Sequence, residues 1–127
     1  MLRTCTPEFE VEHSLAASLD ALRSALRELA AAYAAPIQPL VPRPALFLLS
    51  HIACAAHLLE HAVWAYKVNA ASRHVDLDAF RRWVVDGGLN EAVVDVQMAK
   101  QAQPHRLQED KELVYGVGVN NKVSSRL

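Results

Sequence analysis

Two histidines and a glutamate stand together near the middle of the sequence, at His57, Glu60 and His61. Residues four apart on a helix face the same way, so the two imidazoles could hold one metal ion between them. A carboxylate beside such an ion acts as a general base on metal-bound water in zinc hydrolases. These three residues therefore raise the hypothesis of a metal site at His57 and His61.

The order His-x-x-Glu-His is that of the inverted zinc peptidases, but little else in the sequence supports this class. Those enzymes are large mixed α/β proteins, whereas this chain has 127 residues and a helical composition. Other acidic candidates for a third ligand stand in no recognisable motif: Glu91, Glu109 and Glu112. We expect instead two partly buried imidazoles, with Glu60 paired to His57 or to Lys67.

A cysteine precedes the histidines on the same stretch. Cys54 and His57 are three residues apart, and a thiol beside an imidazole is the pair that makes a thiolate nucleophile. No neighbouring residue supplies an oxyanion hole or an orienting third group, so we do not expect catalysis here. The second cysteine, Cys5, lies in a polar N-terminal stretch. We expect both thiols to be reduced, and a Cys5–Cys54 disulfide is the alternative.

Basic residues are few, and two of them form a basic edge beside aromatic residues. Arg81 and Arg82 stand between Phe80 and Trp83. The formal net charge of −1 gives no general attraction to nucleic acid or to an acidic membrane. Arg81 and Arg82 are candidate contacts to a nucleic acid or a partner. The alternative is a solvated helix face on which Arg82 pairs with Asp86.

The last three residues, Ser125-Arg126-Leu127, are a conservative form of the Ser-Lys-Leu peroxisomal address. A peroxisomal import receptor recognises this tripeptide at a free C-terminus. We therefore expect a peroxisomal protein in which residues 116–127 form a flexible tail, and the cytoplasm is the alternative location. The first ten residues lack the apolar segment of a secretory signal.

The elements that would position these residues are helices. Alanine and leucine dominate, glycine is scarce and no convincing strand pattern occurs, which indicates an all-α bundle of about four helices in one domain over residues 1–115. The first two expected helices are Thr6–Ala35 and Ala45–Asn69. A third is capped by Asp76 or Asp78 and is broken or sharply kinked at Gly87-Gly88. The fourth, Leu89–Gln103, is closed by Pro104. The first helix carries an apolar seam of alternating three- and four-residue steps: Leu15, Leu19, Leu22, Leu26, Leu29 and Tyr33.

A proline-rich segment, PIQPLVPRP, joins the first two helices. Proline is excluded from helix interiors, so the segment is expected to be a stiff extended connector. Its Ile37, Leu40 and Val41 should pack against the body. A ligand for a proline-recognition module is the alternative.

The second helix is apolar almost all round and is long enough to span a membrane. Its several polar groups would be costly in hydrocarbon, so a buried central helix without a membrane is expected. One side should face the core: Leu48, Ile52, Ala55, Leu59, Ala62 and Tyr66. The opposite side holds Ser50, Cys54, His57, His61 and Trp64.

The stretch from Leu46 to Tyr115 resembles the extreme C-terminal helical region of acyl-CoA dehydrogenases. The similarity is closest to the branch with an extended helical tail, which includes the adaptive-response type and its fungal relatives. It is carried by three segments: LLEHAVWAYKV, DLDAFRRWVVDGGL and DKELVYG. The helix from Thr6 to Ala35 matches that family only as a leucine pattern.

The resemblance implies a flavoprotein that binds flavin adenine dinucleotide and oxidises acyl thioesters. The family's Glu-Gly-Thr segment and flavin-contacting β domain are absent from this sequence, so no catalytic, cofactor-binding or metal residue is assigned. We expect a structural role, packing on flavin domains or on a homologous subunit, and no catalysis by the chain alone. The alternative is a free-standing helical interaction or oligomerisation module that uses the leucine seam. A metal-binding helical protein is the third hypothesis.

Overall fold

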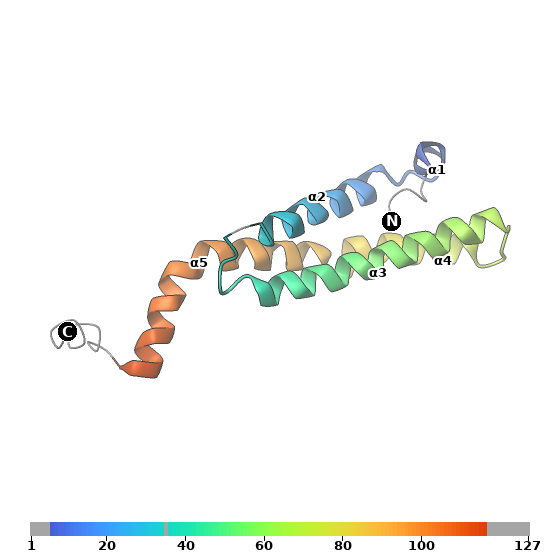
Figure 1. Cartoon of the computed structure of the whole chain (residues 1–127). Coiled ribbons are helices and arrows are strands. Elements are labelled where there is room, and N and C mark those ends of the chain that lie inside the picture. Colours follow the sequence, from blue (N-terminus) through green and yellow to red (C-terminus); the bar gives the residue numbers. More distant parts are fainter. Residues whose placement is uncertain (1–5, 35, 117–127) are drawn as a thin grey trace.

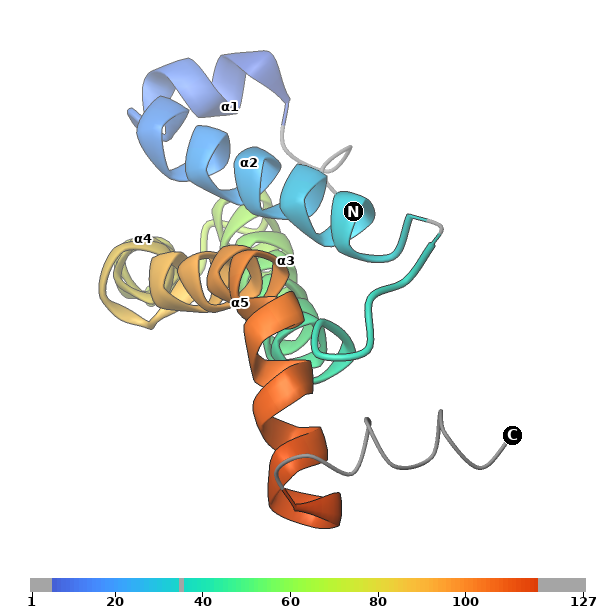
Figure 2. The same ribbon diagram turned by 90° about the vertical axis from the view of Figure 1, so that its left-hand side faces the viewer.

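A computed structural model describes residues 6–34 and 36–116, without the side chains of residues 102–104. The helices are α1 (Pro7–Glu12), α2 (Ala16–Ala32), α3 (Pro42–Lys67), α4 (Arg73–Asp86) and α5 (Leu89–Tyr115). No strand occurs in this part of the chain, so the predicted all-α fold is confirmed, with five helices in place of about four. Figures 1 and 2 show an elongated body, with α1 near one end and the last part of α5 projecting from the other.

The central element is α3, which packs against α2, α4 and α5. Its predicted core side is confirmed, because these residues are buried: Leu48, Ile52, Ala55, Leu59 and Ala62. The last predicted member, Tyr66, is partly buried and packs against the same core. Its predicted opposite side is exposed. By length and hydropathy α3 could also cross a membrane, but core helices share those properties. The core is purely apolar, since no polar or charged residue is buried among the described ones.

The leucine seam of α2 packs within this chain. Leu15, Leu19 and Leu22 are buried, and Leu26 and Leu29 pack against the same core. Contacts from α2 run to α3, α4 and α5. Most side chains of the seam are therefore covered by contacts within this chain.

The expected first helix is divided at Ser14, whereas its leucine pattern predicts a continuous helix. Its start is as predicted: the Thr6 hydroxyl accepts a hydrogen bond from the Phe9 backbone N–H at 3.3 Å, and Pro7 occupies the first turn. Ser14 then adopts φ 53°, and the Leu15 N–H donates to the Glu10 carbonyl at 3.0 Å. This is a Schellman ending with serine at the left-handed position that glycine usually fills, so the sequence gives little sign of it.

The connector between α2 and α3 is shorter than expected, because Pro42 and Pro44 lie in the first turn of α3. Proline is tolerated there, since first-turn N–H groups have no partner within the helix. Val41 is buried as predicted, and Leu40 is partly buried. Ile37 is exposed, so its predicted packing is wrong. At its other end α3 closes through Asn69 at φ 53°, near the predicted boundary.

The predicted cap of α4 is wrong, because the helix begins at Arg73 after Ser72. Asp76 lies in the first turn, where a carboxylate is favoured by the helix dipole, and accepts a hydrogen bond from the Ser72 hydroxyl at 2.9 Å. The predicted break at Gly87-Gly88 is confirmed. Gly88 adopts φ 91°, and a Cβ on Gly87 would lie 2.3 Å from the Trp83 carbonyl oxygen.

Helix α5 continues to Tyr115, so the predicted end at Pro104 is wrong. A proline inside a helix removes one backbone hydrogen bond and tends to kink the helix rather than always end it. Figures 1 and 2 show α5 changing direction along its length, so that its last part leaves the body as an arm.

Candidate functional site

The two histidines that suggested a metal site each approach a different carboxylate. His57 Nδ1 lies 3.6 Å from Glu60 Oε2, which confirms the first of the two predicted partners of Glu60. His61 Nε2 lies 3.6 Å from Asp76 Oδ2, a residue of α4. His61 also stacks on Trp64, with ring centroids 5.5 Å apart. Both imidazoles are largely exposed, so the expectation that they are partly buried is wrong.

Among residues 6–34 and 36–116, no group of three or more histidine, cysteine or acidic side chains is arranged to hold a metal ion. A catalytic zinc site needs three protein ligands and an open position for water. The geometry around His57 and His61 therefore does not support zinc hydrolysis.

The thiol of Cys54 is free and exposed on the same face of α3. The expected reduced state therefore holds for this residue, whereas Cys5 lies outside the described part of the chain. The expectation that Cys54 is not a nucleophile stays a prediction.

The two arginines of the basic edge have different roles in the fold. Arg81 donates a hydrogen bond to the backbone carbonyl of His13, so it ties α4 to the turn between α1 and α2. Arg82 pairs with Asp78 at 2.9 Å, rather than with the predicted Asp86. Asp78 and Asp86 each lie four residues from Arg82 along the helix, and Arg82 pairs with the earlier of the two. Contact of Arg81 and Arg82 with a nucleic acid or partner stays a prediction.

An aromatic and histidine cluster, which the sequence analysis did not find, holds α1 against the end of α3. Ring centroids of Phe9 and His13 are 4.4 Å apart, and those of His13 and Tyr66 are 4.3 Å apart. The Tyr66 hydroxyl lies 2.9 Å from His74 Nδ1. A hollow of about 790 Å³ lies beside these rings, and Arg81 also lines it. These residues come from positions far apart in sequence, so no local pattern could reveal them.

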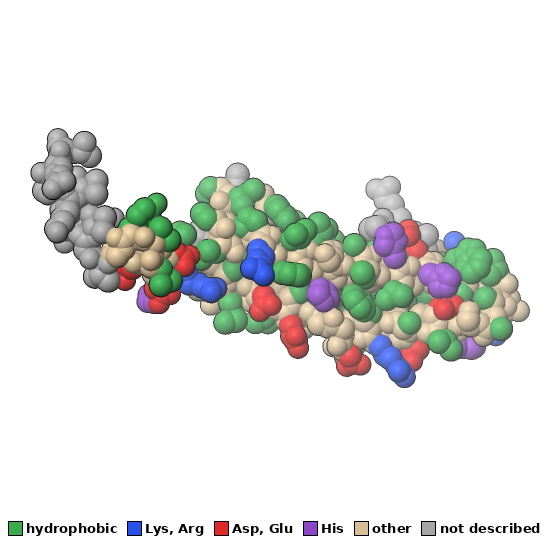
Figure 3. All heavy atoms as spheres, turned by 90° about the horizontal axis from the view of Figure 1, so that it is seen from below, with side chains coloured by type: hydrophobic (Ala, Val, Ile, Leu, Met, Phe, Trp, Pro, Cys, Tyr) green, Lys and Arg blue, Asp and Glu red, His purple; other side chains and the backbone are tan. Residues whose placement is uncertain are grey.

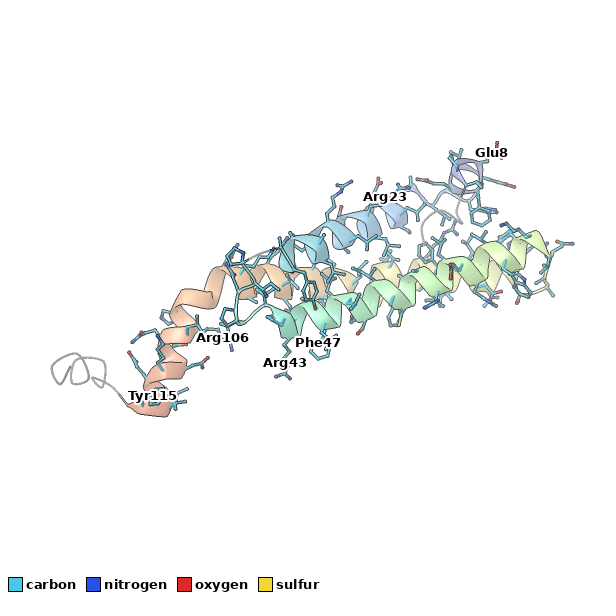
Figure 4. All side chains as sticks on the ribbon, viewed as in Figure 1. Glu8, Arg23, Arg43, Phe47, Arg106 and Tyr115 are labelled. Carbon is cyan, nitrogen blue, oxygen red and sulfur yellow. The ribbon has the colours of Figure 1, made fainter. Side chains whose placement is uncertain are left out.

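A second hollow, of about 580 Å³, lies where the start of α3 meets α5. Phe47 and Met98 form part of its apolar lining, and Arg43 and Arg106 lie among its charged residues. Figure 4 shows Arg43 and Phe47 on the outer side of α3 near the bend of α5. Exposed apolar side chains beside charged groups are typical of a surface that contacts another molecule.

One ionic cluster joins α1 to α2. Arg23 lies 3.4 Å from Glu10 and 3.3 Å from Asp20. The hydrogen bond to Glu10 raises the pKa of the Arg23 guanidinium, with smaller contributions from Asp20. Arginine is charged at every physiological pH, so this cluster is a structural tie and has no role in proton transfer.

The described residues do not fit a complete site for flavin adenine dinucleotide. Such a site would need a phosphate-binding loop and an enclosed cavity for the ring system. The hollows of the described region are broad and open, and no buried side-chain nitrogen or oxygen there lacks a hydrogen-bond partner. We therefore assign no flavin contact to this chain.

These observations define an all-α domain in which the described ionisable groups make several separate ion pairs and hydrogen bonds. Residues 7–115 match the family model described as acyl-CoA dehydrogenase 11 C-terminal domain-like. The chain therefore belongs to that family, and the resemblance inferred from the sequence is confirmed at this level. The match includes α1 and α2, which resemble the family by eye only in their leucine pattern. No curated protein and no solved structure matches the chain.

Residues Ser125, Arg126 and Leu127 lie outside the described part of the chain. The peroxisomal address, its receptor and the boundary of the tail at residue 116 stay predictions.

Proposed function

We propose that this chain serves as the C-terminal helical domain of an acyl-CoA dehydrogenase-like flavoprotein and supports the flavin-binding part by packing rather than by catalysis. The observation that carries the proposal is the family match over residues 7–115.

Two exposed apolar surfaces support a packing role. One is the outer face of α3. The other is the end of the α5 arm, where Leu113, Val114 and Tyr115 are 83%, 73% and 68% exposed. Exposed apolar side chains that are grouped in this way mark contact surfaces in soluble proteins. The free-standing interaction module of the sequence analysis would have to use these surfaces, because the leucine seam is largely buried.

The test uses the purified 127-residue chain, alone and mixed with the flavin-containing part of an acyl-CoA dehydrogenase-like protein. We expect the chain alone to show no flavin absorbance and no oxidation of acyl-CoA, and to form a complex with the flavin-containing part. Stoichiometric flavin or acyl-CoA oxidation in the chain alone would overturn the non-catalytic role. Failure to form the complex would favour the free-standing module.

Peroxisomal localisation belongs to the same proposal, and it rests on the terminal tripeptide Ser125-Arg126-Leu127. Ser125-Arg126-Leu127 can be appended as the last residues of a fluorescent protein. We expect the fusion to enter peroxisomes in cells with the import receptor and to stay in the cytoplasm when Leu127 is deleted. A cytoplasmic signal from the complete fusion would remove the targeting assignment.

A further inference from the structure

Helix α1 is the most weakly attached helix of the described chain, and Figures 1 and 2 show it at the edge of the bundle. It has six residues and none of them is buried, whereas each of the other helices contributes buried residues to the core. Hollows lie on two sides of it, one of about 350 Å³ toward α3 and one of about 790 Å³ toward α4. A helix this short is not stable by itself in water, so α1 depends on the contacts of its side chains.

Few contacts hold α1 in place. The Phe9 ring is partly buried and lies edge-on to the Tyr66 ring, with centroids 5.5 Å apart. The Glu10 carboxylate lies 3.4 Å from the Arg23 guanidinium on α2. The turn that follows α1 accepts a hydrogen bond from Arg81 at one backbone carbonyl. None of these contacts involves a fully buried side chain, so α1 can detach while the apolar core stays closed.

The turn between α1 and α2 provides a hinge at Ser14. Its φ of 53° is a left-handed conformation, which costs energy for a residue with a Cβ. Opening of α1 lets Ser14 leave this conformation, so the hinge opposes the closed state. Local openings of such elements cost less than unfolding of the whole domain.

The charge on α1 is opposite to that of the surface beneath it. Carboxylates stand at every second position from Glu8 to Glu12, and the helix has no basic residue. Among the residues around it on α3 and α4 are Lys67 and Arg81. Among the described residues, no carboxylate forms an ion pair with either of these two side chains.

The acids of α2 and α4 in this region are already paired. Asp20 lies 3.3 Å from Arg23, and Asp78 lies 2.9 Å from Arg82. On the face of the body shown in Figure 3, acidic and basic side chains likewise lie close together. The separation of charge between α1 and the surface beneath it is therefore a local feature of this end of the bundle.

We propose that α1 is a displaceable latch that occupies a docking site for an acidic peptide segment of a partner protein. Tyr66 lines both hollows, so the departure of α1 joins them into one trough. The trough has Val63 and Leu77 in its apolar lining and Lys67 and Arg81 as its basic groups. A partner segment can bind there only when α1 has swung out, which makes α1 an autoinhibitory element.

The chemistry of α1 itself describes the partner segment. Phe9 contacts the Tyr66 ring and stands between two glutamates in the sequence, Glu8 and Glu10. The trough is therefore suited to a short peptide with an aromatic side chain flanked by carboxylates. Nucleic acid fits less well, because the basic groups are few and the formal net charge of the chain is −1. This docking site goes beyond the proposed packing role, since it does not require a flavin-containing part.

Hydrogen exchange of the folded 127-residue chain tests the latch. The backbone N–H groups of Glu10, His13 and Leu15 donate hydrogen bonds within α1 and its turn. We expect their protection factors to be at least about a hundredfold below those of Leu59 and Ala62 in the core of α3. Protection of the α1 amides equal to that of the α3 amides would overturn the latch.

Two substitutions within α1 test which contact holds it closed. Phe9→Ala should lower the protection of the α1 amides about a further tenfold, because it removes the ring contact with Tyr66. Val11→Ala is the matched control, since Val11 is 80% exposed on the same helix, and it should change the protection by less than about twofold. Equal effects of the two substitutions would contradict the assigned contact.

The docking site is tested with a synthetic peptide of residues 6–14, TPEFEVEHS, added to the folded chain. The peptide should bind the Phe9→Ala chain at least about tenfold more tightly than the unsubstituted chain, because a weakened latch competes less with it. NMR signals of Val63, Tyr66 and Lys67 should shift on binding. The same peptide with its glutamates replaced by lysine is the control and should not bind.

Three results would overturn the docking site. The first is no binding of the acidic peptide by the Phe9→Ala chain, or equal binding by both chains. The second is equal binding of the acidic peptide and its lysine control. The third is tighter binding of a short single-stranded DNA than of the acidic peptide, which would assign the trough to nucleic acid instead.

Discussion

The two faces of α3 both carry large apolar side chains, but they differ in what covers them, and the outer face also holds Ser50, His57 and His61. On the inner face, Leu48, Ile52 and Leu59 are buried by α2, α4 and α5. On the outer face, Leu46 and Trp64 are more than half exposed. A core position is defined by the neighbours it contacts, and apolar residue type alone does not identify it. Apolar residues along α3 therefore do not by themselves tell the buried face from the exposed one.

The largest expected loss of stability distinguishes the buried face of α3 from its exposed face. Leu59→Ala should lower the free energy of unfolding by about 2–5 kcal/mol, because it leaves a cavity in the buried apolar core. Leu46→Ala should lower it by no more than about 0.5 kcal/mol at a concentration at which the chain is monomeric, since this side chain is exposed. Urea denaturation measures both. Equal losses would mean that the outer face is packed in the same way as the inner one.

A smaller effect distinguishes a polar contact between elements from one within a helix. Arg81→Met should cost about 1–2 kcal/mol, because it removes the hydrogen bond from α4 to the His13 carbonyl. Arg82→Met should cost less than about 0.5 kcal/mol, since the pair with Asp78 is exposed and local. Thermal denaturation of the two variants provides the comparison. The ranking would be refuted by a greater loss in Arg82→Met.

A substitution in the turn between α1 and α2 should stabilise the fold rather than weaken it. Ser14→Gly should raise the free energy of unfolding by about 0.5–1 kcal/mol, because glycine adopts φ 53° without the steric cost that a Cβ brings. Ser18→Gly, inside α2, should lower it by a similar amount. Paired urea titrations check both signs. Destabilisation by Ser14→Gly would show that the serine side chain is needed at this turn.

The smallest effect concerns the outer face itself. His57→Ala and His61→Ala should each change stability by less than about 0.5 kcal/mol, because their carboxylate pairs are largely exposed. Elemental analysis of the unsubstituted chain and both variants should find no bound metal. Stoichiometric zinc that is lost on either substitution would restore the metal hypothesis.

The repeating patterns of the sequence predicted much of this fold. They indicated the all-α class, the two faces of α3 and the break at Gly87-Gly88, because each depends on residues close together in the chain. The division at Ser14 was not predicted, since serine at a left-handed position has no strong local signature. The early start of α3 was also missed, because proline is disfavoured inside helices but is common in their first turns.

The candidate site was predicted less well than the fold. The pairing of His57 with Glu60 follows from helical spacing, and it was expected. The contact of His61 with Asp76 and the cluster of Phe9, His13 and Tyr66 join separate helices. Such contacts depend on how the helices pack, which residue spacing along one helix does not determine.

The central claim is that this helical domain works as part of an acyl-CoA dehydrogenase-like flavoprotein. The most direct test is to isolate, from its source cells, the polypeptide that contains residues 7–115 and to measure its mass and flavin content. We predict either one polypeptide well above 14.0 kDa with bound flavin, or a 14.0 kDa chain in a stoichiometric complex with a flavin-containing polypeptide. A 14.0 kDa chain with neither bound flavin nor a flavin-containing partner would contradict the account.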